Sequence, residues 1–191
     1  MAVATVLAKE AGGPVDLVGH SFGGRVALGA ALGDSQIRRV VAYEGAPTHV
    51  RRGRPRVVAL AHLEADRGAG RPDLLLERFL RGFIGFTDDG VAAYRANPVW
   101  PERVTAAGQT LLRELRAESS ESAGLDRLGA VRRPVLLVLG SESPPFFRLG
   151  TERLAARLPN GEVAGIPGAA HAAHHTHAGP FVAALEAFLD R

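Results

Sequence analysis

Short apolar runs of strand length alternate with runs of helical spacing along much of the chain. Residues 15–18, 39–43, 135–139 and 162–166 are rich in aliphatic side chains and are bounded by Gly, Pro or polar residues, a pattern typical of buried strands. Residues 24–32 lie between the first two runs and predict a helix whose small side chains allow close packing on a sheet. This strand–helix–strand order predicts a parallel pair of strands joined by a right-handed crossover.

The middle of the chain follows a different pattern. Between residues 47 and 130 the apolar positions recur at helical spacing, and no segment indicates a strand. We therefore expect a helical lid at 47–130, inserted into an α/β core that comprises 1–46 and 131–191. The predicted helices are 1–11, 57–60, 74–80, 91–94, 101–116, 151–158 and 181–189, with a polar link at 118–122.

Composition is that of a folded protein without membrane spans. The chain has 191 residues, of which 46% are apolar, and this fraction excludes a disordered chain. Its apolar runs are shorter than the roughly 18 residues of a membrane span, and its N-terminus does not resemble a secretory signal. Cysteine is absent, which excludes disulfides and thiolate chemistry. We expect a cytoplasmic protein.

The charge balance is basic, with a net charge of +3 and a pI near 10.1. Nearly all basic residues are arginines spread along the chain, which fits a GC-rich coding bias better than a nucleic-acid surface. The one cluster, 51–56, has no aromatic or motif context and predicts a solvated loop. We therefore expect neither a nucleic-acid partner nor a membrane partner.

The segment Gly19–Gly23, with the sequence Gly-His-Ser-Phe-Gly, is the strongest chemical signal. A Gly-x-Ser-x-Gly between a strand and a helix is typical of a nucleophile elbow, in which a strained turn exposes the serine hydroxyl. Gly19 and Gly23 would give the backbone room, and the Phe22 N–H at the helix N-terminus would point toward an oxyanion at Ser21. The alternative is a structural turn with an incidental serine.

A serine nucleophile needs a base, and His171 is the best placed of the seven histidines. It follows the last predicted strand and the loop 167–170, and from there it can reach over the edge of a parallel sheet. His20 is adjacent to Ser21 and is therefore not expected to be its base. We place His20 beside the site, where it packs or forms a hydrogen bond.

Two carboxylates could orient the base. Glu142 follows the strand 135–139, and Glu44 follows the strand 39–43. The chain order Ser, acid, His favours Glu142, with Glu44 as the alternative.

A dense group of imidazoles surrounds the proposed base, comprising His171, His174, His175 and His177. Histidine is a common metal ligand, but no cysteine and no well-spaced carboxylate accompanies the group. We expect no functional metal and no cofactor.

The order of these features resembles the α/β-hydrolase fold, in particular small bacterial serine hydrolases of the esterase type. The segments 15–24, 135–145 and 167–171 carry the resemblance, which covers essentially the whole chain. It implies a mostly parallel sheet of about four strands with helices on both faces, a Ser-His-acid triad, and a carboxylic ester or similar acyl substrate. It also implies an apolar substrate pocket lined by His20, Phe79, Phe83 and Trp100.

The chain departs from the family at two places. The family often has Asp three residues after the glycine that ends the acid-bearing strand, where this chain has Ser143. The family also has strands and a second oxyanion donor before the elbow, and here the elbow begins at residue 19. We therefore expect an N-terminally truncated fold in which strand 15–18 is an exposed edge that could pair with a second copy of the chain. The alternative function is a catalytically weak or inactive remnant, or a binding module.

Overall fold

The computed structural model describes residues 6, 10–33, 36–47, 54–118 and 124–191. Most of the helix predicted at 1–11, the link at 119–122 and part of the basic cluster 51–56 lie outside the described residues. The chain divides into two compact units, each treated separately. The first comprises Met1–Thr48 and Ser120–Arg191, and the second comprises His49–Ser119.

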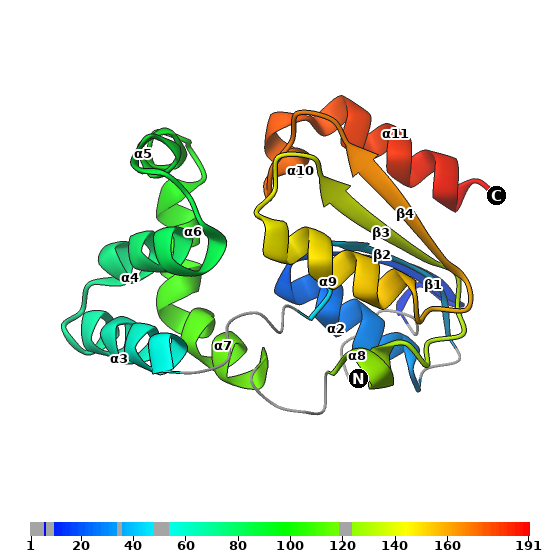
Figure 1. Cartoon of the computed structure of the whole chain (residues 1–191), viewed down its shortest axis with the longest axis horizontal. Helices are drawn as coiled ribbons and strands as arrows, with labels where there is room; N and C mark the ends of the chain where they lie inside the picture. The colour runs from blue at the N-terminus through cyan, green and yellow to red at the C-terminus, as the bar shows by residue number, and fades with distance from the viewer. Residues whose placement is uncertain (1–5, 7–9, 34–35, 48–53, 119–123) are drawn as a thin grey trace. The chain divides into compact units, whose positions relative to one another are not determined.

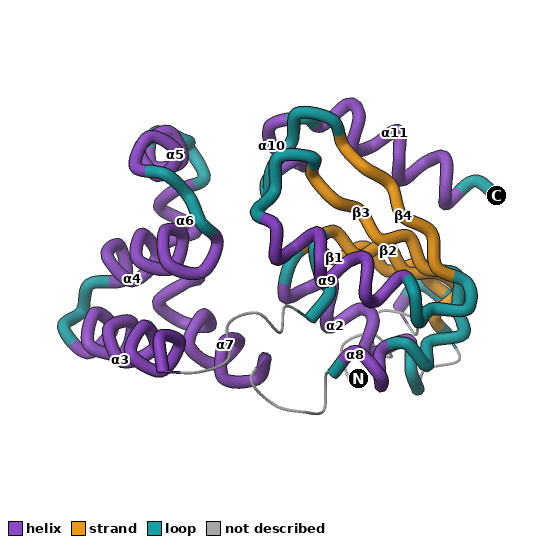
Figure 2. The backbone as a smooth tube through the Cα atoms, viewed as in Figure 1, coloured by secondary structure: helices purple, strands orange, loops and turns teal. Residues whose placement is uncertain are grey.

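A four-stranded parallel sheet forms the centre of the first unit (Figures 1 and 2). The strands lie in the order β1, β2, β3, β4, and each is hydrogen-bonded in parallel to its neighbours. The predicted fold class is confirmed, and each predicted strand is present with boundaries that differ by at most two residues. The strands are β1 Val15–His20, β2 Ile37–Tyr43, β3 Val135–Gly140 and β4 Gly161–Ile166.

Helices cover both faces of this sheet, as Figure 1 shows with α11 (red) on one face and α2 (blue) and α9 (yellow) on the other. The face with α2, α8 and α9 buries aliphatic side chains such as Leu28, Leu128 and Leu154. The opposite face buries Val41 and Phe188 together with apolar residues of α10 and α11. The helices are α2 Phe22–Ala31, α8 Leu125–Leu128, α9 Pro145–Ala155, α10 Ala173–Thr176 and α11 Ala178–Leu189.

Burial along the strands matches their places in the sheet. Every residue of β3 is buried, as expected for an inner strand covered on both faces. β1 is an edge strand that pairs only with β2 among the described strands, and the Val18 side chain is 50% exposed. The predicted edge position of the elbow strand is therefore confirmed.

The second unit is helical, and its described residues contain no strand. Its span, His49–Ser119, is shorter than the predicted 47–130, because α8 packs in the core of the first unit. The helix predicted at 101–116 is interrupted by a π-helical turn at Ala107–Leu111, which includes Gly108 close to Pro72. The elements are α3 Arg54–Gly68, α4 Pro72–Phe79, η2 Leu80–Ile84, α5 Asp88–Arg95, α6 Trp100–Ala106, η3 Ala107–Leu111 and α7 Leu112–Glu118.

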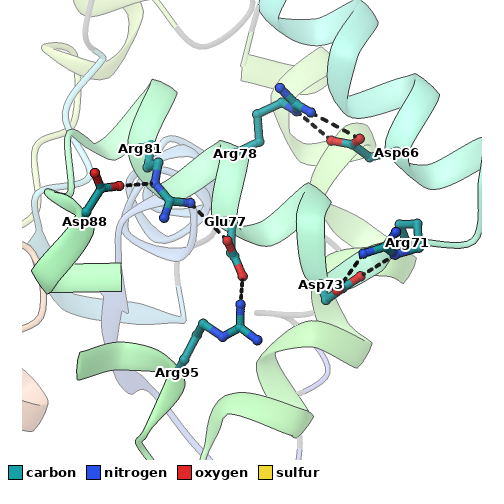
Figure 3. A network of polar contacts seen from close by, with 8 residues as sticks. All are labelled: Asp66, Arg71, Asp73, Glu77, Arg78, Arg81, Asp88 and Arg95. Atoms are coloured by element: carbon teal, nitrogen blue, oxygen red, sulfur yellow. Dashed lines mark hydrogen bonds and ion pairs between the residues drawn. The ribbon is translucent and has the colours of Figure 1, made fainter. Parts of the chain in front are cut away.

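Ion pairs link the helices of this unit, as Figure 3 shows. Glu77 of α4 is largely buried and contacts two arginines, Arg81 at 3.0 Å and Arg95 of α5. Arg81 also contacts Asp88 at 2.8 Å, so one chain of charges joins α4, η2 and α5. A second link joins Arg78 to Asp66 of α3 at 2.6 Å.

Candidate active site

Ser21 occupies a strained turn between β1 and α2. Its backbone has φ 55 and ψ -120, in the left-handed half of conformational space that a residue with a side chain rarely adopts. The Ser21 N–H donates to the carbonyl of Tyr43 at 2.8 Å, which ties the turn to the end of β2. This geometry is that of a nucleophile elbow and places Ser21 at the carboxyl edge of the sheet.

Three glycines make this turn possible. A Cβ at Gly19 would lie 2.4 Å from the carbonyl oxygen of Gly23, and a Cβ at Gly45 would lie 2.7 Å from the carbonyl carbon of Gly24. A Cβ at Gly24 would lie 2.9 Å from the carbonyl oxygen of Gly19. A Cβ at Gly23 would meet nothing within 4 Å, so the expectation that Gly23 provides space is wrong, and Gly24 and Gly45 have that role.

The N-terminus of α2 presents backbone N–H groups beside Ser21. The first helical hydrogen bond runs from the Arg25 N–H to the Ser21 carbonyl at 3.2 Å. The N–H groups of Phe22, Gly23 and Gly24 precede it, so helix geometry leaves them without an intrahelical acceptor. An anion next to Ser21 would be stabilised there by N–H donors and by the helix dipole.

His171 and Glu44 form a buried pair at the same edge of the sheet. The His171 Nδ1 lies 2.5 Å from the Glu44 Oε2, and the two residues are 7% and 3% exposed. The other carboxylate oxygen of Glu44, Oε1, accepts the Gly140 N–H at 2.9 Å and the hydroxyl of Ser143. Because a carboxylate oxygen accepts, the His171 Nδ1 is the donor in this pair, and Nε2 is the ring nitrogen that does not contact Glu44.

This arrangement corrects the preferred assignment of the acid. Glu142 is exposed, and its carboxylate accepts the hydroxyl of the neighbouring Ser141 at 3.1 Å. The residue that contacts His171 is Glu44, the alternative candidate. Its backbone has φ 48, and with Ser21 it is one of two described non-glycine residues with positive φ. This left-handed turn directs the carboxylate toward the loop after β4.

Aromatic rings enclose His171. The Phe147 ring stacks on the imidazole with centroids 4.4 Å apart and an angle of 15°. The His20 ring lies at 4.4 Å, and its Nε2 donates to the His171 carbonyl at 2.7 Å. The expectation that His20 packs or forms a hydrogen bond beside the site is thus met. The Ser21 hydroxyl forms no hydrogen bond with His171 among the described residues, and such contacts are often long in the absence of substrate.

Three further histidines lie on or next to the short helix α10. Among the described residues there is no group of three or more His, Cys, Asp or Glu side chains that could hold a metal ion. His174 and His175 lie on α10 with ring centroids 4.2 Å apart, and the His177 Nδ1 lies 2.8 Å from the Thr176 hydroxyl.

The remaining predicted pocket residues belong to the second unit. Phe79 and Phe83 stack on each other with centroids 5.6 Å apart, and Trp100 meets the edge of Tyr94 at 6.0 Å. Their placement beside Ser21 stays a prediction. Sequence reasoning did not assign roles to Tyr43 or Phe147, because Tyr43 ends a run that indicates only an apolar strand and Phe147 precedes the helix predicted at 151–158.

Comparison with known proteins identifies the family. The sequence model described as the alpha/beta hydrolase family matches residues 1–185, which is nearly the whole chain. The chain belongs to the alpha/beta hydrolase family. No curated protein sequence matches it.

Solved structures of this alpha/beta hydrolase fold are similar to the chain. They include an alpha/beta hydrolase from Sphaerobacter thermophilus (24% identity, TM-score 0.72, covering 83% of this chain and 62% of that one). MenH from S. aureus has 18% identity and a TM-score of 0.77, covering 98% and 72%. The enol-lactonase from Burkholderia xenovorans has 18% identity and a TM-score of 0.67, covering 93% and 66%. At these identities the likeness establishes the fold, and the chain spans 62% of the first of these proteins.

None of the described helices has both the length and the apolar character that are needed to cross a bilayer.

Proposed function

We propose that the chain is a serine hydrolase that cleaves a carboxylic ester or similar acyl substrate through Ser21, His171 and Glu44. The observation that carries the proposal is the buried hydrogen bond from His171 Nδ1 to Glu44 Oε2, at the sheet edge where the strained turn holds Ser21. A nucleophile on an elbow and a base oriented by a carboxylate are the parts that covalent acyl transfer needs.

The reaction begins when the Ser21 hydroxyl oxygen attacks the substrate carbonyl carbon. His171 Nε2 accepts the hydroxyl proton as the new C–O bond forms, and the carbonyl oxygen becomes an oxyanion. The Phe22 N–H at the start of α2 stabilises that oxyanion. When the tetrahedral intermediate collapses, the alcohol oxygen leaves with the proton from His171, and Ser21 remains acylated.

Deacylation uses the same groups in reverse. His171 Nε2 removes a proton from water, and the resulting hydroxide attacks the acyl carbon. The second tetrahedral intermediate releases the acid, and the proton returns to the Ser21 oxygen. Throughout both halves the Glu44 carboxylate accepts a hydrogen bond from the Nδ1–H, which holds the neutral ring in one tautomer and stabilises the imidazolium.

An active-site phosphonate probe tests the proposal directly. We expect the wild-type chain to gain one adduct, located on the Ser21 peptide by mass spectrometry, and Ser21→Ala to gain none. His171→Gln should slow the labelling by about 10²-fold or more, since general-base assistance contributes 10²–10⁴-fold. The matched control is His175→Gln, an exposed imidazole four positions away.

The outcome that would contradict the proposal is equal labelling of the wild-type chain and Ser21→Ala. Labelling of Ser21 that is equally fast in His171→Gln would leave the nucleophile in place and reject the base. A wild-type chain that stays folded and gains no adduct would favour a binding module over an enzyme.

A further inference from the structure

Tyr43, the last residue of β2, contacts the loop that carries His171. Its side chain is fully buried, and its hydroxyl accepts the Ala173 N–H at 3.0 Å and donates to the Ala170 carbonyl. These two backbone groups lie on either side of His171. A side chain at the end of β2 therefore contacts the His171 loop on both sides of His171.

His20 adds a third contact from the neighbouring strand. His20 of β1 and Tyr43 of β2 are register partners, and their ring centroids lie 5.0 Å apart. The His20 Nε2 donates to the His171 carbonyl at 2.7 Å. The backbone of Ala170, His171 and Ala173 is thus held by two adjacent side chains at the carboxyl ends of β1 and β2.

The contacts of Tyr43 are suited to a fixed support. Burial raises the pKa of its phenol well above the ordinary value, so the hydroxyl remains a donor to the Ala170 carbonyl at any physiological pH. Tyr43 also directly precedes Glu44, so one dipeptide supplies both the carboxylate on the His171 ring and the hydroxyl on the His171 backbone. Movement of the loop away from β2 would therefore weaken the contact of the ring with Glu44 and the contact of the backbone with Tyr43 together.

We propose that Tyr43 is a positioning residue for the base: its hydroxyl, with the ring of His20 beside it, fixes the His171 loop so that Nδ1 stays on Glu44. Tyr43 does not touch the reacting atoms and acts through residues 170–173. The inference rests on the proposed serine hydrolase function for its kinetic consequence, while the geometric consequence is measured independently.

The test compares Tyr43→Phe with Tyr94→Phe, the same change at the only other tyrosine in the chain. Both variants keep the ring and lose one oxygen. For Tyr43→Phe we expect kcat for a short-chain nitrophenyl ester to fall by about 10–10²-fold, because a displacement of about 1 Å in a catalytic group costs up to 10²-fold. KM should change by less than about twofold, since substrate contacts are retained. Tyr94→Phe should leave both constants unchanged.

Proton NMR supplies a readout that does not depend on activity. The His171 Nδ1 proton, hydrogen-bonded to a buried carboxylate, should give a far-downfield signal in the wild-type chain and in Tyr94→Phe. In Tyr43→Phe this signal should broaden or disappear, and the Ala173 amide should exchange faster with solvent. A role confined to general stability would lower the unfolding midpoint and leave this signal in place.

A second pair of variants covers the case in which Tyr43→Phe fails to fold. His20→Leu should reproduce the loss of the Nδ1 signal, and His20→Gln, which retains a donor, should restore it. An unchanged Nδ1 signal and unchanged kcat in a folded Tyr43→Phe would overturn the inference, as would an unchanged signal in His20→Leu. If the wild-type chain hydrolyses no ester and does not label at Ser21, the proposed function fails, and the NMR comparison still decides whether Tyr43 positions His171.

Discussion

Glu44 and His171 stand 127 positions apart in the chain and are joined by a buried hydrogen bond of 2.5 Å between Oε2 and Nδ1. Glu44 follows β2, an inner strand next to β1. His171 follows β4, which lies at the other end of the strand order from β1. Between β2 and β4, the last residue of β3 and the loop after it contribute the Gly140 N–H and the Ser143 hydroxyl to the same carboxylate. Residues after three of the four strands therefore meet at one side chain.

Glu44→Gln tests the assignment of the acid. The amide keeps the size of the side chain and loses the charge that stabilises the imidazolium, so kcat/KM for a nitrophenyl ester should fall by about 10²–10⁴-fold. Glu142→Gln is the matched control and should stay within about twofold, because that carboxylate is exposed and contacts Ser141. A larger loss in Glu142→Gln than in Glu44→Gln would return the role to Glu142.

Ser143 is a second position from which a carboxylate side chain could contact His171. Its hydroxyl contacts one oxygen of the Glu44 carboxylate while His171 contacts the other, so an aspartate at 143 would bring a charge close to the imidazole. We expect Glu44→Ala combined with Ser143→Asp to recover about tenfold or more of the activity lost in Glu44→Ala, given the strength of charge-assisted hydrogen bonds. Glu44→Ala with Ser141→Asp is the control and should recover none. Equal rates for the two double variants would reject the idea.

Gly19 and Gly23 allow a comparison within the elbow. The Cβ of Gly19→Ala would lie 2.4 Å from a backbone oxygen, and we expect a loss of about 1–3 kcal/mol in the free energy of unfolding. Gly23→Ala meets open space in the first turn of α2, so it should change stability by less than about 1 kcal/mol, toward stabilisation. Urea unfolding followed by circular dichroism measures both. Equal midpoints would show that the turn can relax around a methyl group.

Tyr43 makes stability depend on pH in the alkaline range. Its pKa is raised by burial above the unfolded value of about 10, so the unfolded chain releases the phenolic proton first as the pH rises. The stabilisation is complete below pH 10 and is lost progressively above it. Urea midpoints between pH 9 and pH 11 should therefore decline less steeply in Tyr43→Phe than in Tyr94→Phe. Parallel declines would indicate that Tyr43 ionises normally in the folded chain.

The ion pairs of the second unit should differ in how much they contribute to the free energy of unfolding. Glu77 is largely buried and contacts Arg81 and Arg95, so Glu77→Gln should cost about 1–3 kcal/mol of unfolding free energy (Figure 3). Asp88 has a side chain that is 91% exposed, and Asp88→Asn should cost less than about 0.5 kcal/mol. Urea unfolding at low and high salt checks the ranking. Equal costs would mean that burial of Glu77 adds nothing to its pairs.

The features that the sequence predicted well are local ones. The strand and helix around Ser21 follow from a short aliphatic run, two glycines and a run of small residues, all within about 20 positions. The position of His171 at this edge follows because a histidine after the last strand lies where parallel strands end, and its role as a base stays a prediction. Neither inference needs to know which side chains meet across the fold.

Which carboxylate contacts His171 depends on information that chain order does not contain. Glu44 and Glu142 both follow strands, and the order Ser, acid, His, on which the preference for Glu142 rests, is satisfied by either residue. The positive φ at Glu44 and the donors from Gly140 and Ser143 distinguish them, and these appear only when β2 and β3 are paired. The helix predicted at 151–158 begins earlier, at Pro145, because proline is favoured in the first turn, and Phe147 adds a buried side chain to it.

The position of His171 after β4 has a consequence for synthesis of the chain. Ser21 and Glu44 leave the ribosome before β3 and β4 have been made, and the His171 imidazole follows these strands. A nascent chain therefore carries the Glu44 carboxylate without its imidazole partner until β4 is complete. The buried hydrogen bond between the two side chains can form only when all four strands have been synthesised.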